Sequence, residues 1–83
     1  MSVKAFVLIE VDTSKNLNVL AALKGIEGVT TANIVTGPYD VIAVINRDKL
    51  EEIGSVIAEK IQPIPGVARV VSCLARNEAI KKD

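Results

Sequence analysis

One short segment of the chain combines residue types that could hold a small molecule. Within five residues, Thr36-Gly37-Pro38-Tyr39-Asp40 contains a glycine that lets a ligand approach the backbone, an aromatic ring and a carboxylate. The same residues also fit an ordinary turn between two strands, in which Asp40 accepts hydrogen bonds from local amides and Tyr39 covers an edge. Residue types alone leave both interpretations open.

The chain offers little else that could carry out catalysis. It contains no histidine and one cysteine, Cys73, which excludes histidine-based catalysis, His/Cys metal sites and an internal disulfide. We expect Cys73 to be a small buried hydrophobic residue rather than a reactive thiol. The loop Val11-Asp12-Thr13-Ser14-Lys15 carries an aspartate and has neither glycine nor arginine, whereas acylphosphatase-type chemistry needs a glycine-rich loop with an arginine there. We therefore expect no enzyme activity, no metal and no cofactor.

Composition and charge restrict the possible partners. The 83 residues are 49% hydrophobic and 24% charged, and ten basic residues balance ten acidic ones. A net charge of zero gives no electrostatic basis for direct binding to nucleic acid or to an anionic membrane. No apolar run approaches the roughly 18 residues of a membrane span. The N-terminus lacks the features of a secretory signal, so we expect a cytoplasmic protein.

The positions of apolar residues predict four strands and two helices. Runs rich in β-branched residues at 3–11, 29–35, 40–46 and 67–74 predict the strands. Because the Gly37-Pro38 pair separates the second and third runs, these two strands should form a hairpin.

The two helices should lie between the strands. The first follows possible N-cap residues at Asp12, Thr13 and Ser14 and ends at Gly25. The second begins with Asp48 and Glu51 as a capping box and ends before Pro63. On the first helix, residues at helical spacing are Leu17, Leu20, Ala21 and Lys24. The second helix has an apolar stripe of Leu50, Ile53, Gly54, Ile57 and Ile61.

The resulting order of elements, βαββαβ, predicts an α+β fold. The phrases Ile26-Glu27-Gly28-Val29 and Ile64-Pro65-Gly66-Val67 repeat the pattern Ile-x-Gly-Val after each helix, although so short a repeat can also be coincidence. Two βαβ halves interleave into a ferredoxin-like sandwich, with a four-stranded antiparallel sheet and both helices on one face. We expect this domain to span residues 1–76, followed by a charged C-terminal tail over 77–83.

The second face of the predicted sheet is also apolar. It carries Phe6 and Leu8 from the first strand and Ile42 and Val44 from the third. Since two helices cover only one face, we expect a second copy of the chain to cover the other and form a homodimer. The alternative is that the tail folds back over the sheet, but it offers only Ala79 and Ile80 as apolar cover.

Two segments give the chain a resemblance to a known family. They are Val35-Thr36-Gly37-Pro38-Tyr39-Asp40-Val41-Ile42-Ala43-Val44 and, after one helix, Ile64-Pro65-Gly66-Val67-Ala68-Arg69-Val70. Together they resemble the effector-binding domain of the Lrp/AsnC (feast/famine) transcription regulators, also called the RAM domain. The resemblance covers essentially the whole chain. Because the chain begins at its first strand, it looks like a stand-alone form without the usual helix-turn-helix domain.

The resemblance implies an assembly and a ligand. Such subunits dimerise through the sheet and form rings of four or five dimers, an octamer or a decamer, with amino acids or related metabolites bound between dimers. It places Gly37, Tyr39 and Asp40 at the pocket, where Asp40 suits an α-ammonium group and the turn amides suit an α-carboxylate. The family often has two threonines on the last strand, and Val70 and Ser72 occupy those positions here. Ser72 is therefore the fourth candidate ligand-binding residue.

Two functions follow from these expectations. In the first, the chain senses a small metabolite, expected to be an amino acid, at subunit interfaces and modulates transcription regulation indirectly, through its own assembly or through mixed oligomers with full-length Lrp/AsnC regulators. In the second, it is an oligomeric assembly or adaptor protein with a vestigial pocket that pairs with those regulators.

Overall fold

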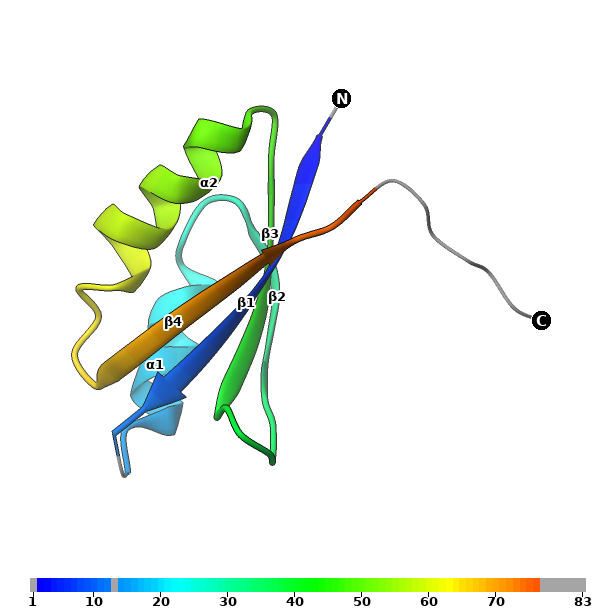
Figure 1. The fold of residues 1–83 in the computed structure, drawn as a ribbon. Coiled ribbons are helices and arrows are strands. Elements are labelled where there is room, and N and C mark those ends of the chain that lie inside the picture. Colours follow the sequence, from blue (N-terminus) through cyan, green and yellow to red (C-terminus); the bar gives the residue numbers. More distant parts are fainter. Residues whose placement is uncertain (1, 13, 77–83) are drawn as a thin grey trace.

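Four antiparallel strands form one sheet, and the helices cover one of its faces (Figure 1). The computed structural model describes residues 2–12 and 14–76, so Thr13 and the predicted tail at 77–83 lie outside the described residues. The elements in chain order are β1 (Val3–Val11), α1 (Asn16–Lys24), β2 (Val29–Ile34), β3 (Val41–Arg47), α2 (Leu50–Val56), a π-helical turn η1 (Ile57–Ile61) and β4 (Val67–Leu74). The predicted ferredoxin-like fold is confirmed.

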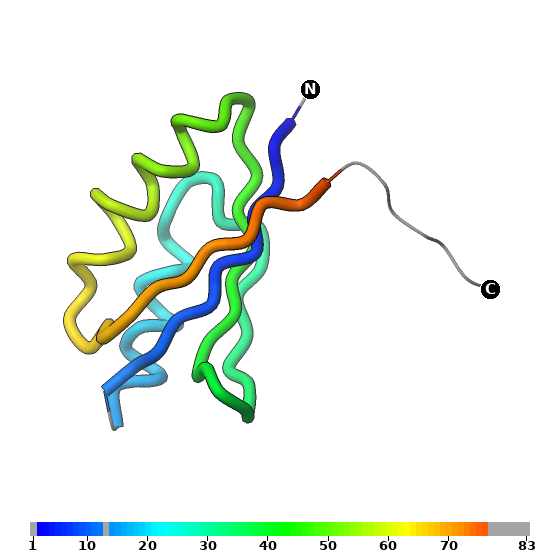
Figure 2. Tube along the Cα trace, viewed as in Figure 1, coloured from blue at the N-terminus to red at the C-terminus, as the bar shows by residue number. Residues whose placement is uncertain are grey.

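The two central strands supply most of the core. The sheet order is β2-β3-β1-β4, so β1 and β3 each have a strand on both sides. The two strands pair in antiparallel register, with Val7 opposite Ala43. Alternate residues of both strands are fully buried beneath the helices because successive strand side chains point to opposite faces. They are Ala5, Val7, Ile9, Val41, Ala43 and Ile45. Figure 2 shows the N-terminus and the end of β4 at the same end of this sheet.

The first helix differs from its prediction in both cap and buried face. Its N-cap residue is Lys15, and no side chain caps it, so the predicted capping by Asp12 or Ser14 is wrong. Its buried residues are Val19 and Leu23, whereas Leu17 is 73% exposed. The backbone explains the shift, because the Asp12 amide donates to the Gly66 carbonyl oxygen (2.8 Å) and so continues the line of β1 before the helix begins.

The second helix begins one residue later than its predicted capping box. The Glu52 carboxylate accepts a hydrogen bond from the Lys49 backbone amide (2.9 Å), and the Glu52 amide donates to the Lys49 carbonyl oxygen (3.1 Å). The prediction that Asp48 and Glu51 form this box is therefore wrong by one position. The predicted end before Pro63 is confirmed, since η1 closes with a bond from the Gln62 amide to the Ile57 carbonyl oxygen (2.8 Å). Among the described residues, no helix is long and apolar enough to cross a membrane.

The hydrogen bond that caps the second helix should make the free energy of unfolding decrease at acid pH. The hydrogen bond from the Lys49 amide, and then the nearby Arg47 guanidinium, lower the pKa of Glu52 below its ordinary value. A lowered pKa contributes stability at pH values above the ordinary glutamate pKa, and this stability is lost as the pH falls through the lowered value.

We expect Glu52→Gln to reduce this acid sensitivity, because glutamine can still accept the Lys49 hydrogen bond but carries no charge. Urea unfolding at neutral pH and between pH 3 and 5 would measure it. The wild type should lose more of its free energy of unfolding across this range than the variant does. Equal losses of the free energy of unfolding in the two proteins would contradict the role of Glu52 in the acid sensitivity.

The two Ile-x-Gly-Val phrases adopt the same backbone conformation. Gly28 and Gly66 have φ values of 99° and 101°, a region that favours glycine. The carbonyl oxygen of Gly28 accepts from the Asn46 amide and that of Gly66 from the Asp12 amide, each at 2.8 Å. Gly28, in the turn after α1, therefore binds the chain near the end of β3. Gly66, in the turn after η1, binds the chain just after β1. The repeat in the sequence corresponds to a repeat in the fold.

Gly66→Ala should strongly destabilise the domain, whereas Gly54→Ala should not. A Cβ atom at Gly66 would lie 2.6 Å from the Lys15 Cβ atom, in addition to the unfavourable φ, so we expect a loss of about 1–3 kcal/mol. Gly54 lies in α2 with no atom within 4 Å of an added Cβ atom, and alanine there should stabilise the helix by about 0.5–1 kcal/mol. Urea unfolding of both variants measures the contrast, and a Gly66→Ala protein as stable as the wild type would contradict it.

Candidate functional site

The segment between β2 and β3 forms a turn anchored to the end of β1. The Val35 amide donates to the Asp40 carbonyl oxygen (2.9 Å), which closes the turn at its base. The Asp40 amide donates in turn to the Ile9 carbonyl oxygen (3.0 Å) on β1. Strand β2 therefore ends at Ile34, one residue before its predicted end. Strand β3 begins at Val41, one residue after its predicted start.

The Asp40 side chain continues the pairing of β1 and β3 by one step. Its Oδ2 atom accepts a hydrogen bond from the Val11 backbone amide (2.8 Å) in a partly buried position. Ile9 is opposite Val41, so the same register would place residue 39 opposite Val11, where the chain has already turned away beside Pro38. The carboxylate takes the place of the missing backbone acceptor. Asp40 therefore accepts from a backbone amide, as in the turn interpretation, but that amide lies 29 residues away in the sequence and not within the turn.

Both segments that resemble the regulator family meet at this end of β1. Asp40 holds the Val11 amide, and the Gly66 carbonyl oxygen holds the next amide, that of Asp12. The pairing of β1 with β4 also shifts register here, between Glu10 and Val11. Two segments separated by a helix in the sequence thus hold two adjacent residues, Val11 and Asp12.

The tip of the turn leaves its backbone amides accessible. Within the described residues, the amides of Thr36, Gly37 and Tyr39 donate to no protein acceptor, and Pro38 has no amide. No atom lies within 4 Å of the position that a Cβ atom at Gly37 would take. Tyr39 and Asp40 are half-buried at the base, while residues 36–38 are exposed. The turn therefore combines open hydrogen-bond donors with one fixed carboxylate.

Ser72 lies apart from the turn within one chain. It is opposite Val7 in the middle of β1, and it is exposed on the edge strand β4. Strand β1 separates β4 from β3, and Asp40 directly precedes β3. Gly37, Tyr39 and Asp40 thus lie together, whereas Ser72 lies on the other side of β1 from them.

The face of the sheet opposite the helices is apolar and uncovered by the described residues. It carries Phe6, which is 39% exposed, beside half-buried Leu8, Ile42, Val44 and Val71. Cys73 lies opposite Phe6 on this face and is exposed, so the prediction of a buried thiol is wrong for the single chain. Successive residues of a strand point to opposite faces of the sheet. Ser72 and Leu74 pair with the core residues Val7 and Ala5 on the helix side, so Cys73 between them points to the uncovered face. The Lys4 ammonium lies 5.2 Å from the centre of the Phe6 ring.

Comparison with known proteins identifies the fold family. The family model of the Lrp/AsnC ligand binding domain matches residues 4–83. The chain belongs to the Lrp/AsnC family. An HTH-type transcriptional regulator of Pyrococcus furiosus is 32% identical to this Lrp/AsnC domain over 74 residues, covering 86% of this chain and 49% of the regulator. The chain thus spans about half the length of the curated relatives that it matches, and these relatives are named as regulators rather than as enzymes.

Solved structures share the fold of this Lrp/AsnC domain. A protein from Thermus thermophilus superposes with a TM-score of 0.89 at 29% identity, covering 95% of this chain and 99% of that protein. A transcriptional regulator from Neisseria meningitidis, solved in complex with L-Met, has a TM-score of 0.83 at 15% identity, covering 95% of this chain and 53% of the regulator. In the described part of this chain, no three acidic or cysteine side chains gather as metal ligands would.

Proposed function

We propose that this Lrp/AsnC domain binds an amino acid at the turn formed by residues 36–40, between copies of the chain, and thereby modulates transcription regulation. One observation carries the proposal: unpaired amides at the tip of the turn lie beside a carboxylate whose position is fixed by the Val11 amide. The Neisseria regulator with the same fold was solved with L-Met, which supports an amino acid as the class of ligand. As part of this proposal, the protein acts in the cytoplasm.

The turn offers both charges of an amino acid a partner. The free amides of Gly37 and Tyr39 can donate to the α-carboxylate of the ligand. Asp40 uses Oδ2 for the Val11 amide, and a carboxylate has about four acceptor positions in all. Its remaining positions can accept from the α-ammonium group, which is a charge-assisted hydrogen bond. The Tyr39 ring then provides an apolar surface for part of the side chain.

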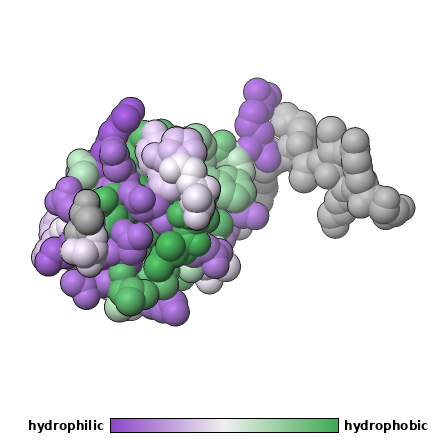
Figure 3. Space-filling view, turned by 90° about the horizontal axis from the view of Figure 1, so that it is seen from below, coloured by the Kyte–Doolittle hydropathy of each residue, from purple (hydrophilic) through white to green (hydrophobic). Residues whose placement is uncertain are grey.

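The end of the molecule that carries the turn is suited to contact with another copy. Figure 3 looks at the molecule from below the view of Figure 1, and hydrophobic surface lies there among hydrophilic residues. Two exposed apolar side chains come from elements that start or end near this turn: Leu17 at the start of α1 and Ile34 at the end of β2, which is 42% exposed. A second copy at this end would bury such side chains and could bring a Ser72 hydroxyl to the pocket.

The uncovered sheet face supports a dimer as the basic unit. Phe6, Leu8, Ile42 and Val44 form a continuous apolar surface across the two central strands. A soluble protein rarely leaves such a surface to water, and an identical surface on a second copy is self-complementary. We propose that dimers formed through this face assemble further, into an octamer or a decamer, through the ends that carry the turn.

One observation favours the second candidate, an adaptor that pairs with full-length Lrp/AsnC regulators. The bond between Asp40 and Val11 already gives the carboxylate a structural role that needs no ligand. In this case the same surfaces build an assembly, and the pocket has lost its function.

A thermal-shift screen of the purified protein against the common amino acids distinguishes the two candidates. A ligand that binds only the folded state at about 100 times its Kd adds about 2.7 kcal/mol. In a domain of this size, each kcal/mol raises Tm by about 4–8 °C. The sensing function predicts a selective rise with one amino acid or a few related ones. A flat response to all of them at millimolar concentration would support the adaptor instead.

A further inference from the structure

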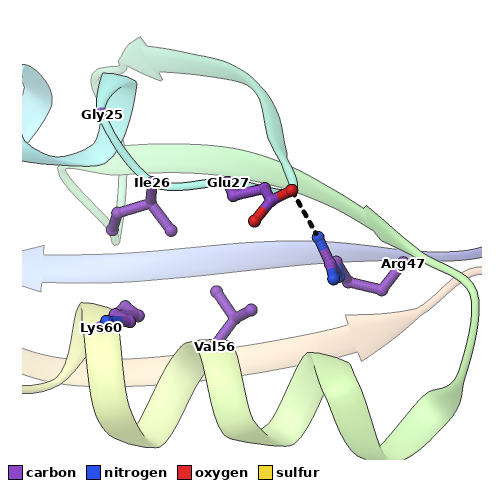
Figure 4. A pocket seen from close by; sticks show the side chains of 6 residues that line it. All are labelled: Gly25, Ile26, Glu27, Arg47, Val56 and Lys60. Atoms are coloured by element: carbon purple, nitrogen blue, oxygen red, sulfur yellow. Dashed lines mark ion pairs between the residues drawn. The ribbon is translucent and has the colours of Figure 1, made fainter.

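We infer that a hollow on the helix side of the sheet is a second binding site, for a small aliphatic carboxylate. The hollow has a volume of about 360 Å³ and is lined by Gly25, Ile26, Glu27, Arg47, Val56 and Lys60. It lies between the turn that follows α1 and the face of α2 and η1 (Figure 4). This inference does not depend on the function proposed for residues 36–40.

The hollow lies at the opposite end of the sheet from the turn. Val41 begins β3 beside the turn and Arg47 ends it beside the hollow. Six strand steps of roughly 3.3 Å put about 20 Å between them. A ligand in one place therefore cannot contact the other within the same chain.

Arg47 is held in place at one end of the hollow. Its side-chain stem packs against Gly28, where an added Cβ atom would lie 2.7 Å from the Arg47 Cδ atom. Its Nη2 atom donates to the Glu52 carboxylate at 3.3 Å, and its side chain is only 27% exposed. Glycine at position 28 thus serves two purposes, since it also adopts a positive φ. The guanidinium is fixed before any ligand arrives, which lowers the entropic cost of binding.

The guanidinium still has unused hydrogen-bond capacity. The Arg47 Nε atom is buried and has no hydrogen-bond partner within the described residues. The Glu27 carboxylate is 4.0 Å from Nη1, and its side chain is 92% exposed, so this contact is a weak surface ion pair. Hydrogen bonds between arginine and a carboxylate are charge-assisted and therefore strong. A ligand carboxylate can displace the exposed Glu27 side chain and accept from Nη1.

The remaining walls define the rest of the ligand. Figure 4 shows Ile26 and Val56 facing each other across the hollow, with Lys60 at one end and Arg47 at the other. Two cations attract an anion, and the two aliphatic side chains suit a short branched hydrocarbon body. These walls therefore suit a short branched carboxylate such as isovalerate.

Titration of methyl-labelled protein with isovalerate tests the site by NMR. We expect saturable shifts of the Ile26 and Val56 methyl resonances. The uncharged amide of the same shape, isovaleramide, should cause none, because it cannot pair with the cations. No saturable shift with isovalerate at tens of millimolar, or equal shifts with the amide, would overturn the site.

Three exposed charges give variants that do not put the fold at risk. Lys60→Gln should weaken isovalerate binding by about three- to tenfold, whereas Glu27→Gln should strengthen it by about two- to fivefold because it removes the competing carboxylate. The matched control Lys24→Gln changes the same charge outside the hollow and should leave the Kd unchanged. Asp40→Asn should also leave it unchanged, which separates this site from the turn. If Lys60→Gln and Glu27→Gln bind as the wild type does, the site is refuted.

Discussion

Asp40→Ala should lose both stability and amino-acid binding, whereas Asp40→Asn should lose mainly the binding. Alanine leaves the partly buried Val11 amide without its acceptor, which we expect to cost about 1–3 kcal/mol of the free energy of unfolding. Asparagine keeps an oxygen that can accept from Val11 but removes the charge that an α-ammonium group needs. The two substitutions thus separate the two roles of one carboxylate.

Urea unfolding and a thermal-shift titration of both variants measure the two effects. Lys24→Ala is a suitable control, because this exposed residue lies at the end of α1, away from the uncovered sheet face. Its stability and binding should match those of the wild type. If Asp40→Asn keeps the full ligand response, the turn carboxylate has no role in binding. If Asp40→Ala unfolds at the wild-type urea concentration, the Val11 bond contributes nothing to stability.

Val44→Lys should dissociate the dimer without unfolding the chain. Val44 is half-buried on the uncovered sheet face, opposite Phe6, and not among the core residues beneath the helices. In a single chain, the lysine ammonium can reach water from this position. Between two packed sheets, the lysine ammonium would be buried without an acceptor or a counter-charge. This burial costs several kcal/mol, more than a single apolar contact across the interface contributes.

Light scattering during size-exclusion chromatography, together with circular dichroism, follows both properties. The variant should elute as a folded monomer, or in a far smaller assembly than the wild type. Ser55→Lys introduces the same charge on the exposed side of α2 and should leave the assembly intact. A wild-type protein that is monomeric at micromolar concentration, or a Val44→Lys protein with unchanged mass, would contradict the sheet interface.

Much of the fold could be predicted because runs rich in β-branched residues mark the strands, and turn residues separate these runs. In β1, residues 5, 7, 9 and 11 are apolar and buried, and β3 repeats the pattern at 41, 43 and 45. The helices were harder to predict in detail, because the start of α1 depends on the long-range bond between Asp12 and Gly66. Nearby Asp and Ser residues suggested caps that the backbone does not use. On α2, several acidic residues within one turn allowed a capping box one position too early.

The candidate site was only partly visible in the sequence. The turn itself has a local signature, but the partner of its carboxylate, Val11, lies 29 residues away and is a backbone amide that any residue type would supply. The role of Gly66 was equally hidden, since its carbonyl oxygen and not its side chain makes the contact. The hollow beside Arg47 combines three separate segments of the chain, and no local pattern links them.

The most direct test of ligand binding at the turn is hydrogen–deuterium exchange of the assembled protein with and without each common amino acid. The free amides at 36, 37 and 39 should exchange quickly in the unliganded protein. The account predicts that one amino acid, or a few related ones, will slow exchange in the peptide that contains residues 35–41, and that Asp40→Asn will abolish this protection. Unchanged exchange at the turn with every amino acid, or protection confined to other segments, would contradict it.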